Sequence, residues 1–394
     1  MASAAVESYS ELVELDGAHS VRWARRVDVP RALEPDRLDL EMLELIATMR
    51  HVLTSQLHRR FNDGRATTTT QRRLKRLSDA GLLERFQFHR RDGGGIPMCN
   101  VIAAGGLRVL ADHDSRLASD LGSPTLGDAG TALTGAPARK AAEEDRLLQA
   151  RHDVHVAGWA LALAGALGPG SSTLRGPERS VLSPPMRSSA QGRVALAPGD
   201  LRMPGGRTPH DFLRTDTGGG ELEVQRFETV RPDAIVEVRD AAGSSALPTD
   251  VIVEFDDRPA IGRAARKLER YDHFLSGWSL HTPRYGTRAE AAPVVVFVCR
   301  DRARARECAR RADSVLRACR AYAGEYPLDW EYPGRERVLF AAERDAHEGL
   351  LFAYGVPRVP PQVRVSAAQG DPRAAEAAVQ PREIASFVRT GPAR

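Results

Sequence analysis

Three carboxylates lie at the ends of two neighbouring apolar segments of this 394-residue chain. Asp233 directly precedes residues 234–238, and Glu254 and Asp256 belong to the next segment, residues 251–256. Because side chains alternate between the faces of a strand, Glu254 and Asp256 share a face, and strand pairing brings Asp233 close to both. Oxygen ligands of this kind hold Mg²⁺ or Mn²⁺. The sequence therefore predicts these three carboxylates as metal ligands, with the ion activating water against a phosphodiester.

A lysine follows the carboxylates. Lys267 lies on the helix predicted for residues 260–276, and an ammonium group there can orient the water or neutralise charge in the transition state. The alternative is structural, with the acids at the strand end paired with nearby arginines. The predicted catalytic residues of a metal-dependent DNA endonuclease or nickase are Asp233, Glu254, Asp256 and Lys267.

The second group of residues with recognisable chemistry is basic. Residues 50–116 contain 13 Lys or Arg against 6 Asp or Glu, an excess that favours a nucleic-acid partner. Within this stretch, residues 69–77 have helical spacing, with Leu74 and Leu77 forming an apolar stripe. Arg and Gln side chains each form paired hydrogen bonds with base edges in the major groove. The predicted DNA-binding residues on this helix are Gln71, Arg72, Arg73, Lys75 and Arg76.

The elements around this helix have the order of a winged helix-turn-helix. Two helices precede it and a hairpin with a glycine-rich tip follows it. Arg90 and Arg91 lie beside the tip, where a basic wing can reach phosphates or the minor groove. The alternative interpretation is a charged, solvated face on a small helical bundle. The three helices and the hairpin are predicted at residues 38–50, 55–61, 68–80 and 82–103.

The remainder of the chain predicts an α/β domain between less regular segments. Residues 1–36 are expected to be irregular or weakly helical, and a long helix is expected at 141–167, as a core helix or a dimer contact. Strands alternate with helices from residue 222 onward, which is typical of an α/β fold. The predicted organisation is a winged-helix domain, a linker, an α/β domain and a disordered tail, at 38–114, 115–140, 141–355 and 356–394.

Composition narrows the class of protein. Apolar residues make up 42% and charged residues 27% of the chain, and no apolar run exceeds six residues. A membrane-spanning helix needs about 20, so we expect a cytoplasmic protein, associated with the nucleoid or a plasmid. The four cysteines form no Cys-x-x-Cys pair, which argues against a disulfide scaffold and a cysteine zinc finger. No P-loop motif occurs, so no nucleotide cofactor is expected.

The carboxylate region resembles the PD-(D/E)xK nucleases. Pro232-Asp233 precedes one strand, and an acidic residue follows in the next, inside a predicted α-β-β-β-α-β core. The resemblance implies a restriction-endonuclease-like fold. In that family the lysine comes two residues after the second acid, a position that Asp256 occupies here, so Lys267 would have to substitute for it.

The chain also resembles the replication-relaxation family of actinobacterial plasmids and integrated mobile elements, over about residues 38–355. The resemblance rests on the segment 40–110, on Arg231-Pro232-Asp233, and on Glu254-Phe255-Asp256 followed by Lys267-Leu268-Glu269-Arg270-Tyr271. It implies a protein that binds double-stranded DNA and is connected with replication, relaxation or transfer of the element.

Two classes of function follow. The first is a metal-dependent endonuclease or nickase that its winged helix directs to DNA. The second is a non-catalytic DNA-binding initiator or transcription regulator whose nuclease-like domain is an inactive scaffold. Convergence of the four predicted catalytic residues in one exposed cleft would favour the enzyme.

Overall fold

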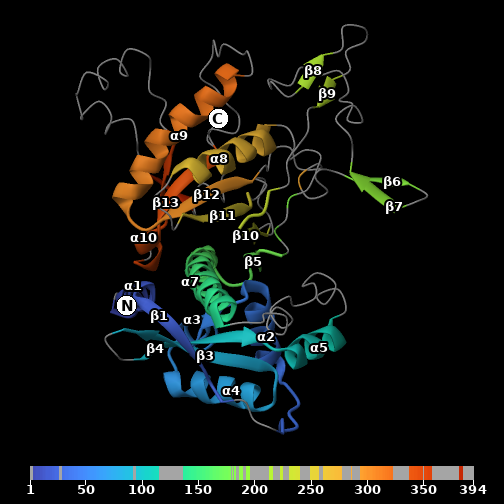
Figure 1. Cartoon of the computed structure of the whole chain (residues 1–394), viewed down its shortest axis with the longest axis vertical. Helices are drawn as coiled ribbons and strands as arrows, with labels where there is room; N and C mark the ends of the chain where they lie inside the picture. The colour runs from blue at the N-terminus through green and yellow to red at the C-terminus, as the bar shows by residue number, and fades with distance from the viewer. Residues whose placement is uncertain are drawn as a thin grey trace. The chain divides into compact units, whose positions relative to one another are not determined.

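The computed structural model divides into two units, and each is described by itself (Figure 1). Unit 1 comprises residues 1–169, 174–180 and 347–349, and unit 2 comprises residues 170–173, 181–346 and 350–394. The structure describes residues 3–25, 29–91, 95–114, 136–178, 180, 182, 186–189, 192–195, 213–215, 222–224, 230–239, 249–256, 261–276, 285, 293–322, 337–348, 350–356 and 381–384.

Unit 1 contains the basic segment. Its hairpin and the three helices before it begin and end within one residue of their predicted positions. The elements of unit 1 are α1 (Ser3–Asp16), β1 (Ala18–Trp23), α2 (Arg37–Met49), β2 (Val52–Leu53), α3 (Thr54–Phe61), α4 (Thr67–Asp79), β3 (Leu83–Arg90), β4 (Gly95–Ile102), α5 (Ala104–His113) and α7 (Ala136–Leu167).

Local sequence explains where α2 begins and where α4 ends. Asp36 caps α2 by accepting a hydrogen bond from the Asp39 backbone N–H at 2.8 Å, and the Asp39 carboxylate accepts one from the Asp36 N–H at 3.2 Å. This reciprocal pair is a capping box. Gly81 follows α4 with a φ of 72°, a conformation that costs glycine little and other residues more, so the helix ends there.

A four-stranded antiparallel sheet, in the order β1-β3-β4-β2, completes the basic module. The first strand differs from expectation, because residues 1–36 carry no regular apolar pattern. In the structure β1 adds to the outer edge of the hairpin, with Trp23 opposite Phe86. Leu12 and Leu15 of α1 are fully buried against the same sheet, in one cluster with Phe86 and Phe88.

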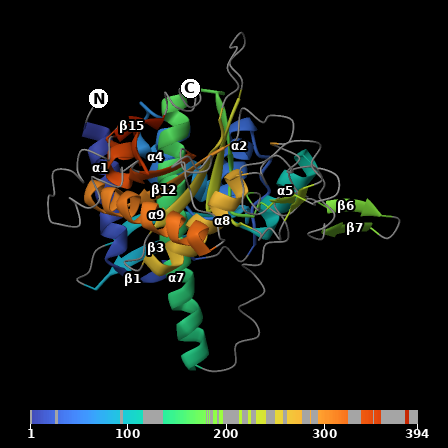
Figure 2. The ribbon, with the colours of Figure 1, turned by 90° about the horizontal axis from the view of Figure 1, so that it is seen from above.

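The long helix α7 belongs to unit 1, whereas its sequence position predicted that it would belong to the α/β domain. Leu147, Ala150 and Val154 are buried in the cluster that contains Leu12 and Phe86. α7 is a single helix from Ala136 to Leu167, and parts of it near both ends are visible in green in Figure 2. Its described start, Ala136, also precedes the predicted one, and residues 115–135 of the predicted linker lie outside the described residues.

Unit 2 is built on a mixed seven-stranded sheet in the order β15-β14-β13-β12-β11-β10-β5. β11, β12 and β13 are mutually parallel, and β10 is antiparallel to β11. The strands of this sheet are β5 (Ser172–Arg175), β10 (Ala234–Val238), β11 (Val251–Asp256), β12 (Val294–Cys299), β13 (Val338–Ala342), β14 (Phe352–Gly355) and β15 (Pro381–Glu383). The other elements are β6 (Met186–Ser189), β7 (Gly192–Ala195), β8 (Leu213–Thr215), β9 (Leu222–Val224), α8 (Ile261–Ser276), α9 (Arg302–Tyr322) and α10 (Glu343–His347).

Two helices cover one face of this sheet. α8 and α9 lie side by side in Figures 1 and 2, and their apolar residues share a core cluster with Ile252, Phe297 and Phe340. The rings of Phe297 and Phe340 stack with centroids 5.4 Å apart. This core brings the even-numbered face of β11, which carries Glu254 and Asp256, against the two helices.

The predicted mixed α/β fold class is confirmed. One strand falls inside the segment that was expected to be a disordered tail: β15 pairs with β14, and most of the remaining tail lies outside the described residues. In the described part of the chain, no helix has the length and apolar character needed to span a membrane.

Candidate nucleic-acid interface and carboxylate cluster

α4 presents a polar face opposite its buried stripe. Leu74 and Leu77 are completely buried, while Gln71, Arg72 and Lys75 are exposed. No hydrogen bond or ion pair joins the side chain of Gln71 or Arg72 to another described residue, whereas the Lys75 ammonium pairs with Asp79 at 2.6 Å. Two of the predicted DNA-binding side chains are therefore open to a ligand as they stand.

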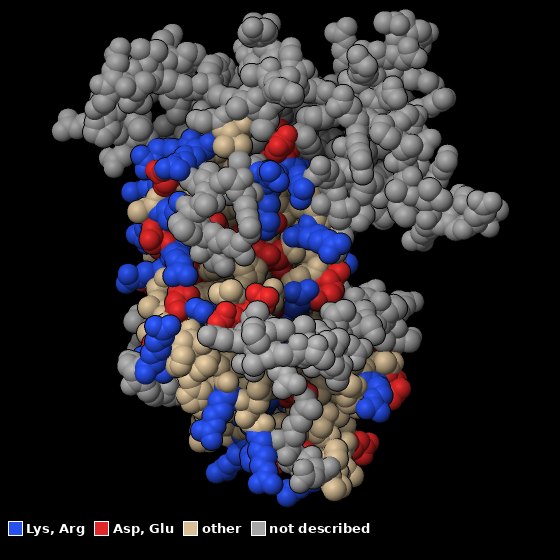
Figure 3. All heavy atoms as spheres, in the orientation of Figure 1, with Lys and Arg blue, Asp and Glu red and all other residues tan. Residues whose placement is uncertain are grey.

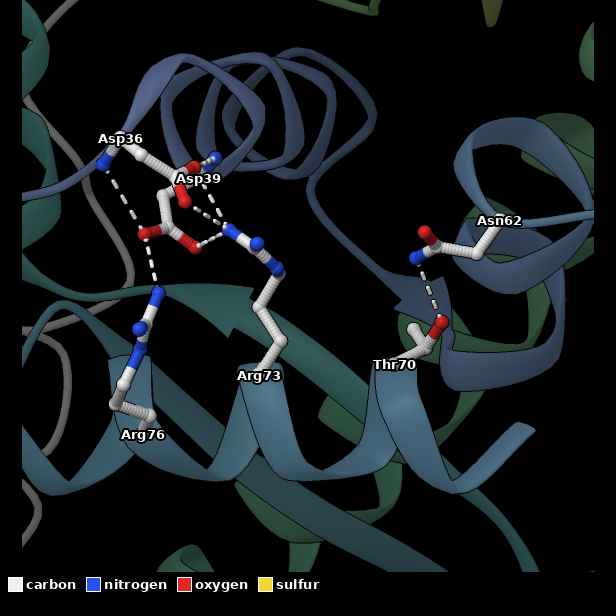
Figure 4. A network of polar contacts seen from close by, with 6 residues as sticks. All are labelled: Asp36, Asp39, Asn62, Thr70, Arg73 and Arg76. Carbon is white, nitrogen blue, oxygen red and sulfur yellow. Dashed lines mark hydrogen bonds and ion pairs between the residues drawn. The ribbon is translucent and has the colours of Figure 1, made fainter. Parts of the chain in front are cut away.

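The other two predicted residues on α4 are engaged within the protein (Figure 4). The Arg73 guanidinium donates to Asp36 at 2.7 Å and to Asp39 at 2.6 Å, and Arg76 donates to Asp39 at 2.7 Å. The Asp39 side chain is fully buried, and hydrogen bonding to Arg73 holds the pKa of Asp36 below its usual value. These contacts attach α4 to the start of α2, so Arg73 and Arg76 position the helix.

A groove of about 720 Å³ lies along the polar face of α4. Gln71, Arg72 and Lys75 line one side, and Arg85 of β3 lines another. Glu11 and Glu14 of α1 also line it, and they place negative charge among these cations. Figure 3 shows Lys and Arg side chains gathered at the lower end of the view, where α4 lies in Figure 1.

The hairpin places the remaining predicted basic residues. Arg91 is exposed at the tip, and the Arg90 guanidinium lies 3.9 Å from the Glu14 carboxylate. Residues 92–94 of the tip lie outside the described residues. The negative charge of α1 therefore lies close both to the groove and to the tip end of the hairpin.

In unit 2, the start of β10 meets the middle of β11. The Asp233 carboxylate accepts a hydrogen bond from the Phe255 backbone N–H at 2.8 Å, and the Asp233 N–H donates to the Val253 carbonyl at 3.1 Å. The antiparallel register of the two strands brings Asp233 beside Glu254, as the sequence predicted.

Glu254 is buried and its two carboxylate oxygens are engaged from α8. The Lys267 ammonium pairs with one oxygen, and the Tyr271 hydroxyl donates to the other at 2.5 Å. Burial and the neighbouring Asp233 raise the pKa of Glu254 to about 8, against the opposing effect of Lys267. Tyr271 is a member of this site that the sequence did not predict. Its spacing of four residues from Lys267, one helical turn, is the signal that places both on one helix face.

Asp256 takes part in a different group, although it shares a face of β11 with Glu254. Its carboxylate accepts a hydrogen bond from Arg304 of α9 at 3.2 Å and lies 3.7 Å from the Cys308 sulfur. Hydrogen bonding with Cys299, with help from Arg304, lowers the pKa of the Cys308 thiol. The structure thus brings Asp233, Glu254 and Lys267 together and directs Asp256 to α9.

The geometry of these acids does not suit the predicted Mg²⁺ site. An octahedral ion needs several convergent oxygen ligands with room for bound water. Glu254 is only 1% exposed and is held by Lys267 and Tyr271, and Asp256 is held by Arg304. Within the described residues, this arrangement does not present three carboxylates to one point, and it therefore does not fit the ion.

The buried acid leads to a pH-dependent prediction. Because the pKa of Glu254 is higher in the folded chain than in the unfolded chain, the folded state binds its proton more tightly. The free energy of unfolding therefore falls as the pH rises from about 5 to about 8. Glu254→Gln cannot titrate, so we expect a flatter pH profile in urea denaturation and a more stable protein at the upper end.

Glu269→Gln, a partly exposed position on the same helix, is the control for this measurement. It should keep the pH profile of the wild type. An unchanged profile in Glu254→Gln would contradict the assignment of this titration to Glu254.

Comparison with known proteins identifies a family. A family model described as replication-relaxation matches residues 43–290. No curated protein and no solved structure matches the chain. The matched region covers more than half of the chain and includes α4, its hairpin and the Asp233, Glu254 and Lys267 group. The chain therefore belongs to the replication-relaxation family.

Proposed function

We propose that this protein binds double-stranded DNA through α4 and the β3–β4 hairpin. The observation that carries the proposal is the exposed polar face of α4, on which Gln71 and Arg72 have no partner among the described residues. The order helix, strand, helix, helix and hairpin supports a winged helix, in which the third helix enters the major groove.

The chemistry of these side chains suits duplex DNA. The Arg72 guanidinium carries the paired donors that read the guanine edge, and the Gln71 amide carries the donor and the acceptor that read the adenine edge. Lys75 and Arg91, which are also exposed, supply charge for phosphates. Membership of the replication-relaxation family connects the chain with replication or relaxation of a plasmid or mobile element, and we infer that the DNA of that element is the target.

The test is fluorescence anisotropy with labelled duplexes that tile the element from which the chain comes, at several salt concentrations. If this surface binds DNA, the affinity should fall as the salt concentration rises. A plot of the logarithm of the binding constant against the logarithm of the salt concentration should have a slope of about −0.9 for each phosphate neutralised. Tighter binding to one duplex than to scrambled DNA would add sequence recognition. Absence of salt-dependent binding to every duplex would overturn the proposal.

The acidic residues of α1 provide a gain-of-affinity prediction. Glu11 and Glu14 line the same groove as Arg72 and Lys75, and at moderate salt charges within about 10 Å still interact. Replacing both, as Glu11→Gln/Glu14→Gln, removes repulsion toward phosphates and releases Arg90 from Glu14. We expect DNA affinity to rise by about three- to tenfold, which corresponds to about 0.7–1.4 kcal/mol.

Glu41→Gln is the matched control because Glu41 is an exposed acid on α2 that pairs with Arg37 and does not line the groove. Its affinity should equal that of the wild type. Unchanged or weaker binding by the double variant would show that α1 does not oppose DNA at this surface.

A second candidate function is metal-dependent cleavage or nicking of the bound DNA. The proximity of Asp233, Glu254 and Lys267 at paired strands favours it. The burial of Glu254, and an arrangement of acids that does not fit Mg²⁺, favour an inactive scaffold. Incubating the protein with supercoiled plasmid and Mg²⁺ or Mn²⁺ distinguishes a nuclease from an inactive scaffold. Conversion by the wild type and not by Asp233→Ala/Glu254→Ala would establish a nuclease. A shift of the DNA on a gel without conversion would establish a binding protein.

A further inference from the structure

Three side chains from three elements of unit 2 meet at the carboxyl ends of two parallel strands. Asp256 is the last residue of β11 and lies opposite Cys299, the last residue of β12. Cys308 reaches the same point from α9. The carboxylate oxygen and the two sulfurs all lie within 4.8 Å of one another. Among the described residues, this is the group of three potential ligands that the fold draws together most closely.

We propose that Asp256, Cys299 and Cys308 form a binding site for Zn²⁺. Zinc is bound tetrahedrally, with Zn–S bonds of about 2.3 Å and Zn–O bonds of about 2.0–2.2 Å. Ligand atoms around such an ion are therefore separated by about 3.5–3.8 Å. The distance of 3.7 Å between the Cys308 sulfur and the Asp256 oxygen already has this value. Water would complete the fourth position, as it does where three protein groups hold the ion.

The chemical types of the three ligands, two thiols and one carboxylate, favour zinc. Thiolates are soft ligands that favour zinc over Mg²⁺, so this site differs in kind from the oxygen site that the sequence predicted around Asp233. Binding replaces the thiol protons of Cys299 and Cys308, which pass to solvent. Cys299 and Cys308 also lie beyond residue 290, where the family match ends, so the match does not imply the site.

The local charges suit a bound zinc ion. Two thiolates and one carboxylate carry three negative charges against two positive charges on the metal, which leaves a net charge of minus one. The guanidinium of Arg304, 3.2 Å from the Asp256 carboxylate, balances this charge and fixes the orientation of the ligand. Cys299 is fully buried and Asp256 is 12% exposed, so the carboxylate marks the side from which an ion enters.

The test is metal analysis of the full chain, purified without a metal-affinity tag, loaded with ZnCl₂ and then dialysed. We expect about one zinc ion per chain in the wild type and close to none in Cys308→Ser or Asp256→Asn. Cys99→Ser is the control, because Cys99 is a buried thiol in unit 1 and is not part of the group. Loading with Co²⁺ should produce the intense visible bands of a tetrahedral ion and a sulfur-to-cobalt charge-transfer band.

Circular dichroism of every variant keeps loss of zinc separate from loss of fold. A folded wild type without zinc, or a Cys308→Ser protein that retains it, would overturn the proposal. A Cys299–Cys308 disulfide in protein purified under reducing conditions would also overturn it. All of these readouts are independent of DNA binding.

Discussion

Replacing Gln71 and Arg72 together by alanine is expected to weaken duplex binding on the order of 100-fold without changing the fold. Both side chains are exposed on α4 and have no partner among the described residues, so their removal disturbs no contact that holds the helix. A side chain that makes paired contacts with a base contributes about 1–3 kcal/mol. Fluorescence anisotropy measures the effect, and circular dichroism verifies the fold.

Arg37→Ala is the matched control for this experiment. Arg37 is an exposed arginine of unit 1 that pairs with Glu41 on α2, and it does not line the groove. Arg37→Ala and Arg72→Ala each remove one positive charge, but from different surfaces of the protein. Equal weakening by Arg37→Ala and Arg72→Ala would mean that only net charge matters, and an unaffected double variant would exclude α4 as the DNA-reading helix.

The second large effect is expected from Asp39→Ala, which should lower the free energy of unfolding by about 3 kcal/mol. Asp39 is fully buried, takes part in the capping box of α2 and accepts hydrogen bonds from Arg73 and Arg76. Removing one member of a buried ion pair costs about 3–5 kcal/mol. We expect the low end because the two guanidinium groups are 22% and 49% exposed and regain water.

Urea denaturation followed by tryptophan fluorescence and circular dichroism measures this change. Glu41→Ala removes an exposed acid from the same helix and should alter stability by less than about 0.5 kcal/mol. In a double-mutant cycle with Arg73→Ala, the coupling energy between Asp39 and Arg73 should exceed about 1 kcal/mol. A coupling near zero would contradict the role of Arg73 in attaching α4 to α2.

Arg72 and Arg73 are neighbours on α4 with different roles, and they show what the sequence alone can and cannot predict. Helical spacing correctly separates the apolar stripe of Leu74 and Leu77 from the polar faces of α4. It cannot tell which arginine meets solvent and which meets the start of α2, because Asp39 lies 34 residues away along the chain. Side chains of one type on one helix therefore acquire different roles through tertiary contacts.

The positions of the N-terminal segment and of the long helix α7 also could not be predicted from local sequence. Residues 1–36 carry no regular apolar pattern, yet β1 gains an ordered position by pairing with β3. The cost of ordering such a segment is offset by long-range pairing and burial, which no local window contains. The unit to which α7 belongs is likewise decided by where Leu147, Ala150 and Val154 find apolar partners.

The sequence by itself determined the local elements and their order: the helices and hairpin around α4, the strand that follows Asp233, the strand that contains Glu254, and the α/β class. These follow from periodicity, glycine positions and alternation within windows of a few residues. Only the tertiary structure decided that Tyr271 joins Lys267 on Glu254 and that Asp256 turns to Cys299 and Cys308. The physical reason is that strand register and helix placement set the distances between residues that are remote in the chain. Those distances decide which side chains each acid contacts and therefore which reactions or ligands it can take part in.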